Sequence, residues 1–191
     1  MNLTLKEGGI GMLIGKYSSY YCVALIALLL GGCAPETKST DSQATAASVA
    51  WWYDIQFEPD ATTVRGLDIR AIDANWKMAI ALDASLLKGR ISDSDITDFN
   101  NSKMSFSLES DFDGDGIAEE FFVGTYETSG SEIGRFVAII RNGEVIQNFK
   151  ENGTIGFSAL LQSDDEVRWY KCLECGEYES IKWSGGSFSI E

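Results

Sequence analysis

The chain of 191 residues contains no histidine, two prolines, and 15 basic residues against 29 acidic ones. The lack of histidine excludes Ser-His-Asp and Cys-His catalysis and the usual histidine-based catalytic zinc sites. The formal net charge of −14 opposes binding to nucleic acid and to anionic lipid head groups. Because 45% of the residues are hydrophobic and 12% are aromatic, the chain is too apolar to be disordered throughout. These features favour a folded acidic protein and argue against histidine-dependent enzymes, whereas catalysis by a pair of carboxylates remains possible.

The first part of the chain has the pattern of a secretion signal. Residues 21–30 read YCVALIALLL, an apolar run shorter than the roughly 20 residues that a membrane-spanning helix needs. With Lys16 before it, this run is typical of the hydrophobic region of a signal peptide. The alternative is an ordinary N-terminal anchor helix.

The run ends in Leu30-Gly31-Gly32-Cys33, which resembles the lipobox of bacterial lipoproteins. The resemblance implies that residues 1–32 are a signal peptide and that Cys33 is lipidated, so that the chain binds a membrane through its lipid. In this family an aspartate after the cysteine retains the protein in the inner membrane. Ala34 therefore implies the outer membrane, facing the periplasm or the cell surface.

Two further segments follow from composition. Residues 34–50, APETKSTDSQATAASVA, are dominated by Ala, Ser and Thr, and we expect them to form a flexible tether after the lipidated Cys33. Residues 51–191 are long enough to bury about two thirds of their surface, so we expect a single domain there.

We expect this domain to be α+β and mainly antiparallel β, a meander of hairpins with about one N-terminal helix packed on it. Residues 52–57 should be extended, and Pro59 should end that stretch. Residues 73–87 place Trp76, Ala79, Ile80 and Leu87 at helical spacing, with Asp73 as N-cap and Gly89 as stop, and predict the helix. Residues 92–102, SDSDITDFNNS, should form a polar loop.

The remaining sequence has the pattern of strands. Apolar residues alternate with serines from Met104 to Leu108, and apolar runs cover residues 121–126, 136–140 and 145–149. Asn142-Gly143 is the strongest short signal for a hairpin, and Ser184-Gly-Gly-Ser187 indicates another. Residues 124–134, GTYETSGSEIG, should form a flexible loop that serves as a binding rim or as a plain connection.

The segment from Asp111 to Glu119, DFDGDGIAE, carries the clearest chemical signal. Its three aspartates alternate and converge on one point only if the chain curls, which Gly114 and Gly116 allow. Ca²⁺ takes six to eight oxygens at about 2.3–2.6 Å. We expect side-chain oxygens from Asp111, Asp113, Asp115 and Glu119 and the carbonyl of Ile117 to bind it; these groups are the complete predicted ligand set. A solvated acidic turn without metal is the alternative, but its carboxylates would repel each other.

The EF-hand pattern fits only in its first half, because Phe122 occupies its twelfth position. The segment instead resembles the calcium loops of FG-GAP and VCBS repeat proteins, in which DxDGDGxx(D/E) precedes a hydrophobic strand. Asp111, Asp113, Asp115 and Glu119 match the ligand positions of those loops. Only one such repeat is present, so the propeller of that family is not implied. We expect a structural calcium staple rather than a sensor or a catalytic metal.

Two smaller features complete the set. Cys172 and Cys175 form a single CxxC pair, and no further Cys or His is left to complete a zinc site, so we expect a structural disulfide. Trp51, Trp52 and Tyr53 are expected to pack in the core, with contact to glycan or lipid as the alternative.

These observations favour a lipid-anchored envelope protein whose calcium-stapled domain binds an envelope protein or a glycan without catalysis. Two alternatives stay open: a glycan or peptidoglycan hydrolase that uses two carboxylates, and an acidic inhibitor or immunity-type protein that binds a basic enzyme.

Overall fold

The structure is a computed structural model that describes residues 50–191. The chain divides into two units, Met1–Ala44 and Thr45–Glu191, and the described residues belong to the second. The predicted signal peptide, the lipidation of Cys33 and nearly all of the tether lie outside the described residues. In residues 50–191, no helix is long and apolar enough to cross a membrane.

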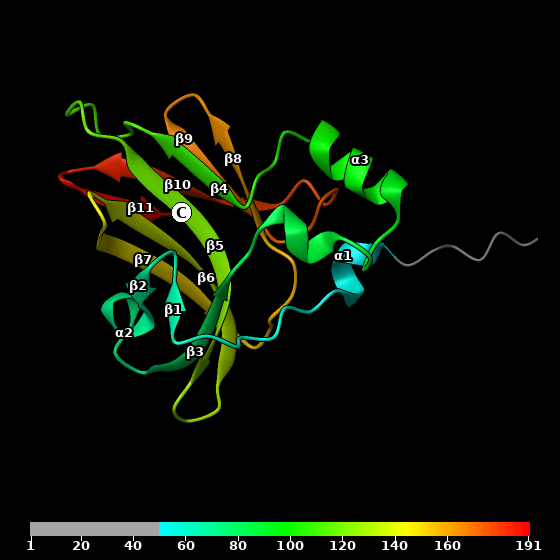
Figure 1. Cartoon of the computed structure of the whole chain (residues 1–191). Helices are drawn as coiled ribbons and strands as arrows, with labels where there is room; N and C mark the ends of the chain where they lie inside the picture. The colour runs from blue at the N-terminus through cyan, green and yellow to red at the C-terminus, as the bar shows by residue number, and fades with distance from the viewer. Residues whose placement is uncertain (1–49) are drawn as a thin grey trace, which may run out of the picture. The chain divides into compact units, whose positions relative to one another are not determined.

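The described residues form three α-helices, one 3₁₀ helix and eleven strands (Figure 1). In chain order they are α1 (Trp51–Asp54), β1 (Thr63–Val64), β2 (Leu67–Asp68), α2 (Ile69–Ile72), β3 (Trp76–Ala81), η1 (Ala84–Leu87), α3 (Asp93–Asn101), β4 (Ser107–Ser110), β5 (Glu119–Thr128), β6 (Ile133–Arg141), β7 (Glu144–Asn152), β8 (Ala159–Ser163), β9 (Glu166–Tyr170), β10 (Tyr178–Ser184) and β11 (Ser187–Ile190).

Antiparallel pairing dominates, which confirms the predicted fold class. The first sheet has the order β3-β5-β6-β7, and β4 pairs with the half of β5 that β3 leaves free. The second sheet has the order β11-β10-β9-β8. Strands β1 and β2 form a small separate hairpin beside α2 (Figure 1).

The two sheets are joined along both sides. On one side Ser105, just before β4, and Leu160 of β8 exchange two main-chain hydrogen bonds of 2.8 and 2.7 Å. On the other side the Gln147 amide of β7 takes the place of a strand neighbour. Its Nε2 donates to the carbonyl of Phe188 at 2.7 Å, and its Oε1 accepts from the Phe188 N–H at 3.2 Å. Residues of both sheets thereby enclose the main core.

The first sheet is buried on both faces, because a core lies on each side of it. Phe121, Val123, Val137 and Ile139 pack into the main core against the second sheet. The alternate residues of the same strands, among them Phe122 and Phe136, pack into a second core under β1, β2 and α2. A side chain at Gly124 would collide with the Phe136 ring and the Ile80 carbonyl, so this position requires glycine.

The helix predicted over residues 73–87 is wrong. Strand β3 and the 3₁₀ helix η1 occupy this segment. The pairing of β3 with β5 shifts between Trp76 and Met78, and this bulge puts Trp76 and Ala79 into the same core. A bulge adds one residue to a strand, so the three-residue spacing of buried side chains imitated a helix.

The polar loop predicted over residues 92–102 is also wrong, because α3 covers most of it. Ser92 and Asp95 form a capping box: the Ser92 hydroxyl accepts the Asp95 N–H, and the Asp95 carboxylate accepts the Ser92 N–H, each at 3.2 Å. Phe99 is the buried residue of this helix and packs on Phe106 and Phe157. One buried residue gives no periodicity, and for that reason the helix was missed.

The hairpin predictions are confirmed, with one exception nearby. Asn142 and Gly143 have φ of 51° and 78°, as a tight turn with two left-handed residues requires. Strands β10 and β11 flank Gly185-Gly186. The flexible loop predicted over residues 124–134 is wrong, since β5 and β6 leave only residues 129–132 between them. Strand β8 was not predicted.

The aromatic cluster at the start of the domain lies mostly against the core. Trp51 and Trp52 pack on the main core from α1, whereas Tyr53 is 69% exposed. The extended stretch predicted over residues 52–57 is therefore wrong in its first part and correct in its last, since Ile55 and Phe57 are buried after α1 ends.

Candidate metal centre

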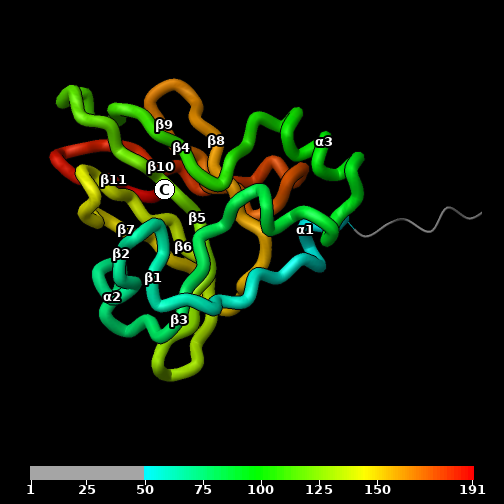
Figure 2. The backbone as a smooth tube through the Cα atoms, viewed as in Figure 1, coloured from blue at the N-terminus to red at the C-terminus, as the bar shows by residue number. Residues whose placement is uncertain are grey.

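The predicted calcium segment is the connection between β4 and β5, and we call residues 111–118 the aspartate loop. Ser110 and Glu119, which flank the loop, are paired residues of β4 and β5. The loop extends from the end of the sheets at which the turns β6–β7 and β10–β11 also lie (Figure 2). Its two ends are thus held by strand pairing, while its middle is free to curl.

The three aspartates fold the loop by accepting its own N–H groups. Oδ1 of Asp111 accepts from Gly114 at 2.8 Å and from Asp115 at 3.1 Å, and its Oδ2 accepts from Gly116 at 2.9 Å. Oδ1 of Asp113 accepts from Asp115, and Oδ1 of Asp115 accepts from Ile117. Gly114 and Gly116 have φ of 76° and 89°, a conformation that side chains disfavour.

This curl brings together three of the predicted ligands. One carboxylate oxygen from each of Asp111, Asp113 and Asp115 lies within 4.8 Å of the others. Two oxygens on opposite sides of a Ca²⁺ ion, each about 2.3–2.6 Å from it, are about 4.6–5.2 Å apart. The cluster therefore has the dimensions of a metal site and could hold a cation.

The structure places Glu119 and Ile117 differently from the three aspartates. Glu119 is fully buried, and its carboxylate accepts the N–H of Phe112 at 2.9 Å. The Phe112 ring packs edge-on against Phe121 beside it. Ile117 is 41% exposed at the surface of the loop. Glu119 thus ties the start of the loop to the first residue of β5.

Sequence reasoning missed Arg141, the last residue of β6. Its Nε donates to Oε1 of Glu119 at 2.7 Å, and its Nη2 lies 2.5 Å from the same oxygen. Nη2 also bonds Oδ2 of Asp113, and Nη1 lies 3.3 Å from Oδ2 of Asp115. One guanidinium therefore contacts three of the four predicted carboxylate ligands.

A signal for Arg141 was present in the sequence. Strands β5 and β6 pair from Glu119↔Arg141 to Glu127↔Ile133, a register centred on Gly130. A tight turn at Gly130, with both strands extended from it, would have placed Arg141 opposite Glu119. A loop over residues 124–134, as expected from the sequence, leaves the register of the two strands undetermined, and Arg141 is then not placed opposite Glu119.

The guanidinium of Arg141 and the carboxylates around it each stabilise the charged form of the other. Burial of Asp113 acts to raise its pKa, but the N–H of Asp115 and the guanidinium of Arg141 outweigh burial and lower this pKa below its ordinary value. Hydrogen bonds to Glu119 and Asp113 raise the pKa of Arg141. The repulsion expected among the carboxylates of a metal-free loop is accordingly reduced by a cation from the protein itself.

The predicted cysteine pair lies in the connection between β9 and β10. The Cα atoms of Cys172 and Cys175 are 5.8 Å apart, within the usual range for a disulfide. Cys172 and Leu173 are buried, whereas Cys175 is exposed. The connection thus inserts two apolar side chains into the core and closes beside them at the surface.

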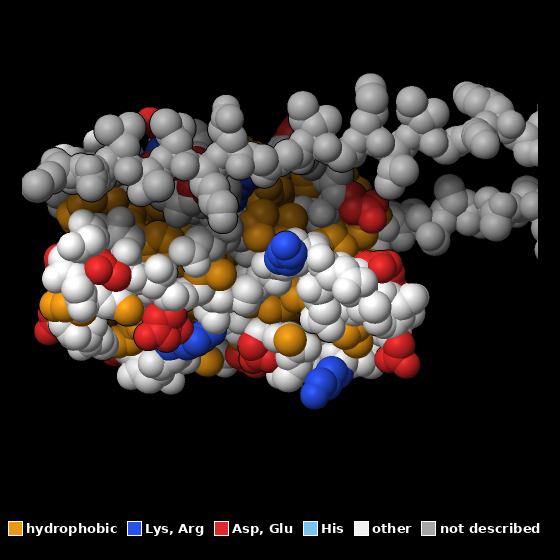
Figure 3. Space-filling model, turned by 90° about the horizontal axis from the view of Figure 1, so that it is seen from above, with side chains coloured by type: hydrophobic (Ala, Val, Ile, Leu, Met, Phe, Trp, Pro, Cys, Tyr) orange, Lys and Arg blue, Asp and Glu red, His pale blue; other side chains and the backbone are white. Residues whose placement is uncertain are grey.

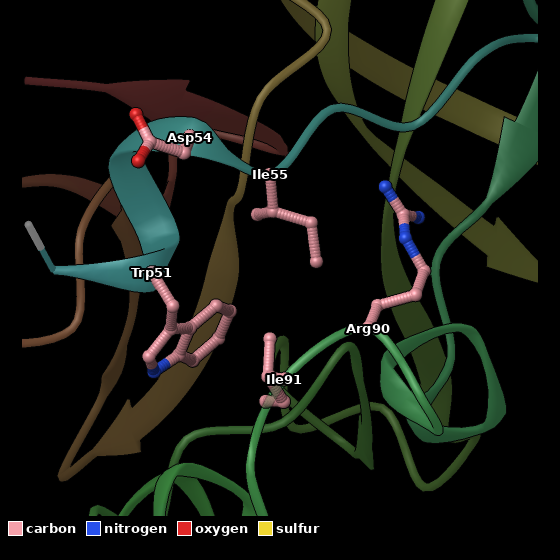
Figure 4. Close-up of a pocket in the computed structure, with 5 residues that line it drawn as sticks. All are labelled: Trp51, Asp54, Ile55, Arg90 and Ile91. Carbon is pink, nitrogen blue, oxygen red and sulfur yellow. The ribbon is translucent and has the colours of Figure 1, made fainter.

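A surface hollow of about 380 Å³ lies next to α1 and is lined by Trp51, Asp54, Ile55, Arg90 and Ile91 (Figure 4). Ile55, Ile91 and the indole of Trp51 face it, and Arg90 lies across from the indole. Arg90 donates to the Gln56 carbonyl at 2.5 Å and lies over the Phe57 ring. These contacts give the arginine a structural role at the edge of the hollow.

Comparison with protein-family models, with curated proteins and with solved structures finds no match to this chain.

Proposed function

We propose that the aspartate loop binds Ca²⁺ and that the domain is a non-catalytic binding module of the bacterial envelope. The observation that carries the proposal is the convergence of three aspartate oxygens within 4.8 Å on a loop whose ends are joined by strand pairing. A cation bound there would connect β4 to β5 beyond their hydrogen bonds. The role of calcium would then be that of a structural staple.

The donor set favours calcium over other ions. All candidate ligands are oxygens, and a flexible loop suits the variable coordination of Ca²⁺ better than the strict octahedron of Mg²⁺. Phe122, at the position where an EF-hand supplies its bidentate glutamate, is fully buried in the second core. We therefore expect weak binding, with a Kd of about 10⁻⁴ to 10⁻³ M, as in extracellular modules.

The proposed location rests on the sequence. The lipobox-like Leu30-Gly31-Gly32-Cys33 supports a lipid anchor at Cys33, and Ala34 supports the outer membrane. We propose an envelope protein or a glycan as the partner. On the face shown in Figure 3, acidic side chains are spread among basic and apolar ones and do not form one continuous patch. This distribution gives no support to the inhibitor-type alternative on that face.

Calorimetry of the purified domain tests the calcium site. At millimolar Ca²⁺ and a Kd near 10⁻⁴ M, binding to the folded state alone adds about 1.4 kcal/mol to the free energy of unfolding. This gain raises the melting temperature by about 3–6 °C. Magnesium should give a smaller shift. Asp113→Ala should abolish most of the calcium effect, whereas Asp98→Asn, an exposed position on α3, should leave it intact.

A wild-type melting curve that is indifferent to calcium up to about 10 mM would refute the site. The anchor has a separate test in whole cells that are fed a labelled fatty acid. Cys33→Ala should abolish incorporation of the label and release the protein from membranes, and label that persists in this variant would contradict lipidation at Cys33.

A further inference from the structure

The oxygens of the aspartate loop are divided between two kinds of donor. In Asp113 and Asp115, Oδ1 accepts an N–H of the loop, at 3.0 and 2.8 Å respectively. Oδ2 of each faces the guanidinium of Arg141. The Oδ1 atoms therefore fold the loop, while the Oδ2 atoms are the oxygens that face a cation. The cation that they face comes from another strand of the same chain.

We propose that Arg141 and the metal compete for the aspartate loop, so that Ca²⁺ binds only when the guanidinium releases Asp113 and Asp115. The inference rests on the proposed calcium function and adds its regulation. Two cations cannot share the same carboxylate oxygens at bonding distance without strong repulsion. A planar guanidinium bonded to three carboxylates makes strong charge-assisted hydrogen bonds, and a metal that binds Asp113 and Asp115 must replace the bonds to these two residues.

Glu119 and the position of Arg141 in the fold determine how the exchange proceeds. The Glu119 carboxylate is fully buried and bonds both Nε and Nη2 of Arg141, so it can retain the arginine after the aspartates are released. Arg141 directly precedes the Asn142-Gly143 turn between β6 and β7. The side chain that would release the aspartates is thus anchored at the end of β6, beside this turn.

The competition predicts that Arg141 lowers the calcium affinity and stabilises the calcium-free protein. Arg141→Met retains an unbranched, flexible side chain, although a shorter one, and removes the charge and the hydrogen bonds of the guanidinium. We expect this variant to bind Ca²⁺ about tenfold more tightly or better, since hydrogen bonds to charged groups must be broken only in the wild type. In EDTA its melting temperature should be lower than that of the wild type, and added calcium should close most of this difference.

Arg135→Met is the matched control. Arg135 lies on the same strand, but it pairs with Glu151 and donates to the Phe157 carbonyl, away from the loop. This variant should lose stability equally with and without calcium and should bind calcium as the wild type does. Arg141→Lys, which retains the charge but not the planar fork, should show an intermediate affinity.

The experiment is a calorimetric titration of each protein with CaCl₂, combined with NMR of the Arg141 side-chain N–H signals in the wild type. Those signals should shift as calcium is added. Because this measurement uses the wild-type protein, it does not depend on whether the variants fold. If Arg141→Met binds no more tightly than the wild type, or if the Arg141 signals stay fixed while calcium binds, the competition is overturned and the calcium site stands. If no variant and no wild-type protein binds calcium up to about 10 mM, the calcium proposal itself fails.

Discussion

Glu119 and Arg141 are directly paired residues of β5 and β6, and their side chains are joined at 2.7 Å where the aspartate loop meets the sheet. The pair connects the loop to the centre of the first sheet rather than to its edge. Glu119 is fully buried and its partner is 21% exposed, so solvent screens the pair only from one side.

Glu119→Gln should lower the melting temperature by an amount on the order of 5–10 °C, because a neutral amide replaces the fully buried carboxylate that accepts charge-assisted hydrogen bonds from Arg141 and from the N–H of Phe112. Thermal unfolding checks this value in EDTA. Glu120→Gln is the neighbouring control: Glu120 pairs with Arg65 at 2.5 Å, and both are about 30% exposed. A surface pair of this kind contributes little, so a loss in Glu120→Gln as large as that in Glu119→Gln would contradict the assignment.

Asp111→Ala should disrupt the aspartate loop even without metal. The Asp111 carboxylate accepts three N–H groups of the loop, whereas the ion pairs of Arg141 in the described part of the chain are with Asp113, Asp115 and Glu119. Its loss leaves the N–H groups of Gly114 and Gly116 without their acceptor, while the Asp115 N–H still donates to Oδ1 of Asp113, and we expect a cost of about 1 kcal/mol for a solvent-exposed turn. Amide hydrogen exchange should therefore rise in EDTA at Gly114 and Gly116, and less at Asp115. Asp115→Ala is the control, since its loss leaves these three N–H groups with their Asp111 acceptor.

Asp111→Ala and Asp115→Ala distinguish two roles of the aspartates, folding of the loop and contact with a cation, which the sequence pattern does not separate. From the sequence, all carboxylates of the loop were expected to bind metal. In the structure, Asp111 folds the loop, whereas Asp113 and Asp115 divide their oxygens between the loop and Arg141. The sequence predicts repulsion among the carboxylates of a calcium-free loop, but in the structure Arg141 offsets this repulsion at Asp113 and Asp115. With the guanidinium present, Asp113→Ala should lower stability in EDTA as well.

The predictable parts of the fold are those in which local chemistry determines the conformation. Asn142-Gly143 requires two left-handed residues and therefore indicated its hairpin. The run Phe136–Ile140 is continuously apolar because both faces of the first sheet are covered, and a run of this kind is typical of a fully buried strand. The curl of the aspartate loop is likewise determined locally, by its aspartate side chains, which accept N–H groups of the loop, and by its two glycines, which have positive φ.

The parts of the fold that differ from the sequence-based expectations depend on partners distant in the sequence. The bulge in β3 exists only through its pairing with β5 and gave Trp76 and Ala79 a helical spacing. Helix α3 buries one phenylalanine, whose contacts Phe106 and Phe157 lie elsewhere in the chain. Arg141 reaches the aspartate loop only because β6 returns along β5. In each case the conformation depends on a strand pairing or a packing contact between distant segments, and the residue pattern of one segment does not reveal it.

The cysteine pair should resist reduction in the folded protein. A thiolate can reach only the exposed sulfur of Cys175, and its attack would expel the thiolate of Cys172, which is 3% exposed. A buried thiolate is a poor leaving group because burial raises the pKa of its thiol. Titration of the unreduced, oxidised protein should find no thiol. Mild reductant should release two thiols rapidly only after denaturant is added, and fast release from the native protein would contradict this protection.

Acid should destabilise the domain through the ion pairs of Glu151, one of which lies within the first sheet while the other reaches the second. Glu151 of β7 pairs with Arg135 of β6 at 3.1 Å and with Lys171, beyond β9, at 2.8 Å. Burial of Glu151 acts to raise its pKa, but the hydrogen bonds from Arg135 and Lys171 outweigh it and lower the pKa below the ordinary 4.5. The ionised form is therefore favoured in the folded state.

The sign of the pH dependence follows from this lowered pKa. The stabilisation is fully present above the unfolded pKa of 4.5 and is lost as the pH falls through the folded pKa. The melting temperature should accordingly decline below a pH of about 4.5. Glu151→Gln should melt a few degrees lower near neutral pH and should decline less in acid, because its contribution is already absent. Glu58→Gln, at an exposed position without an ion pair among the described residues, is the control. If the melting temperatures of wild type and Glu151→Gln fall in parallel as the pH is lowered, the ion pairs of Glu151 do not contribute to the stability of the domain.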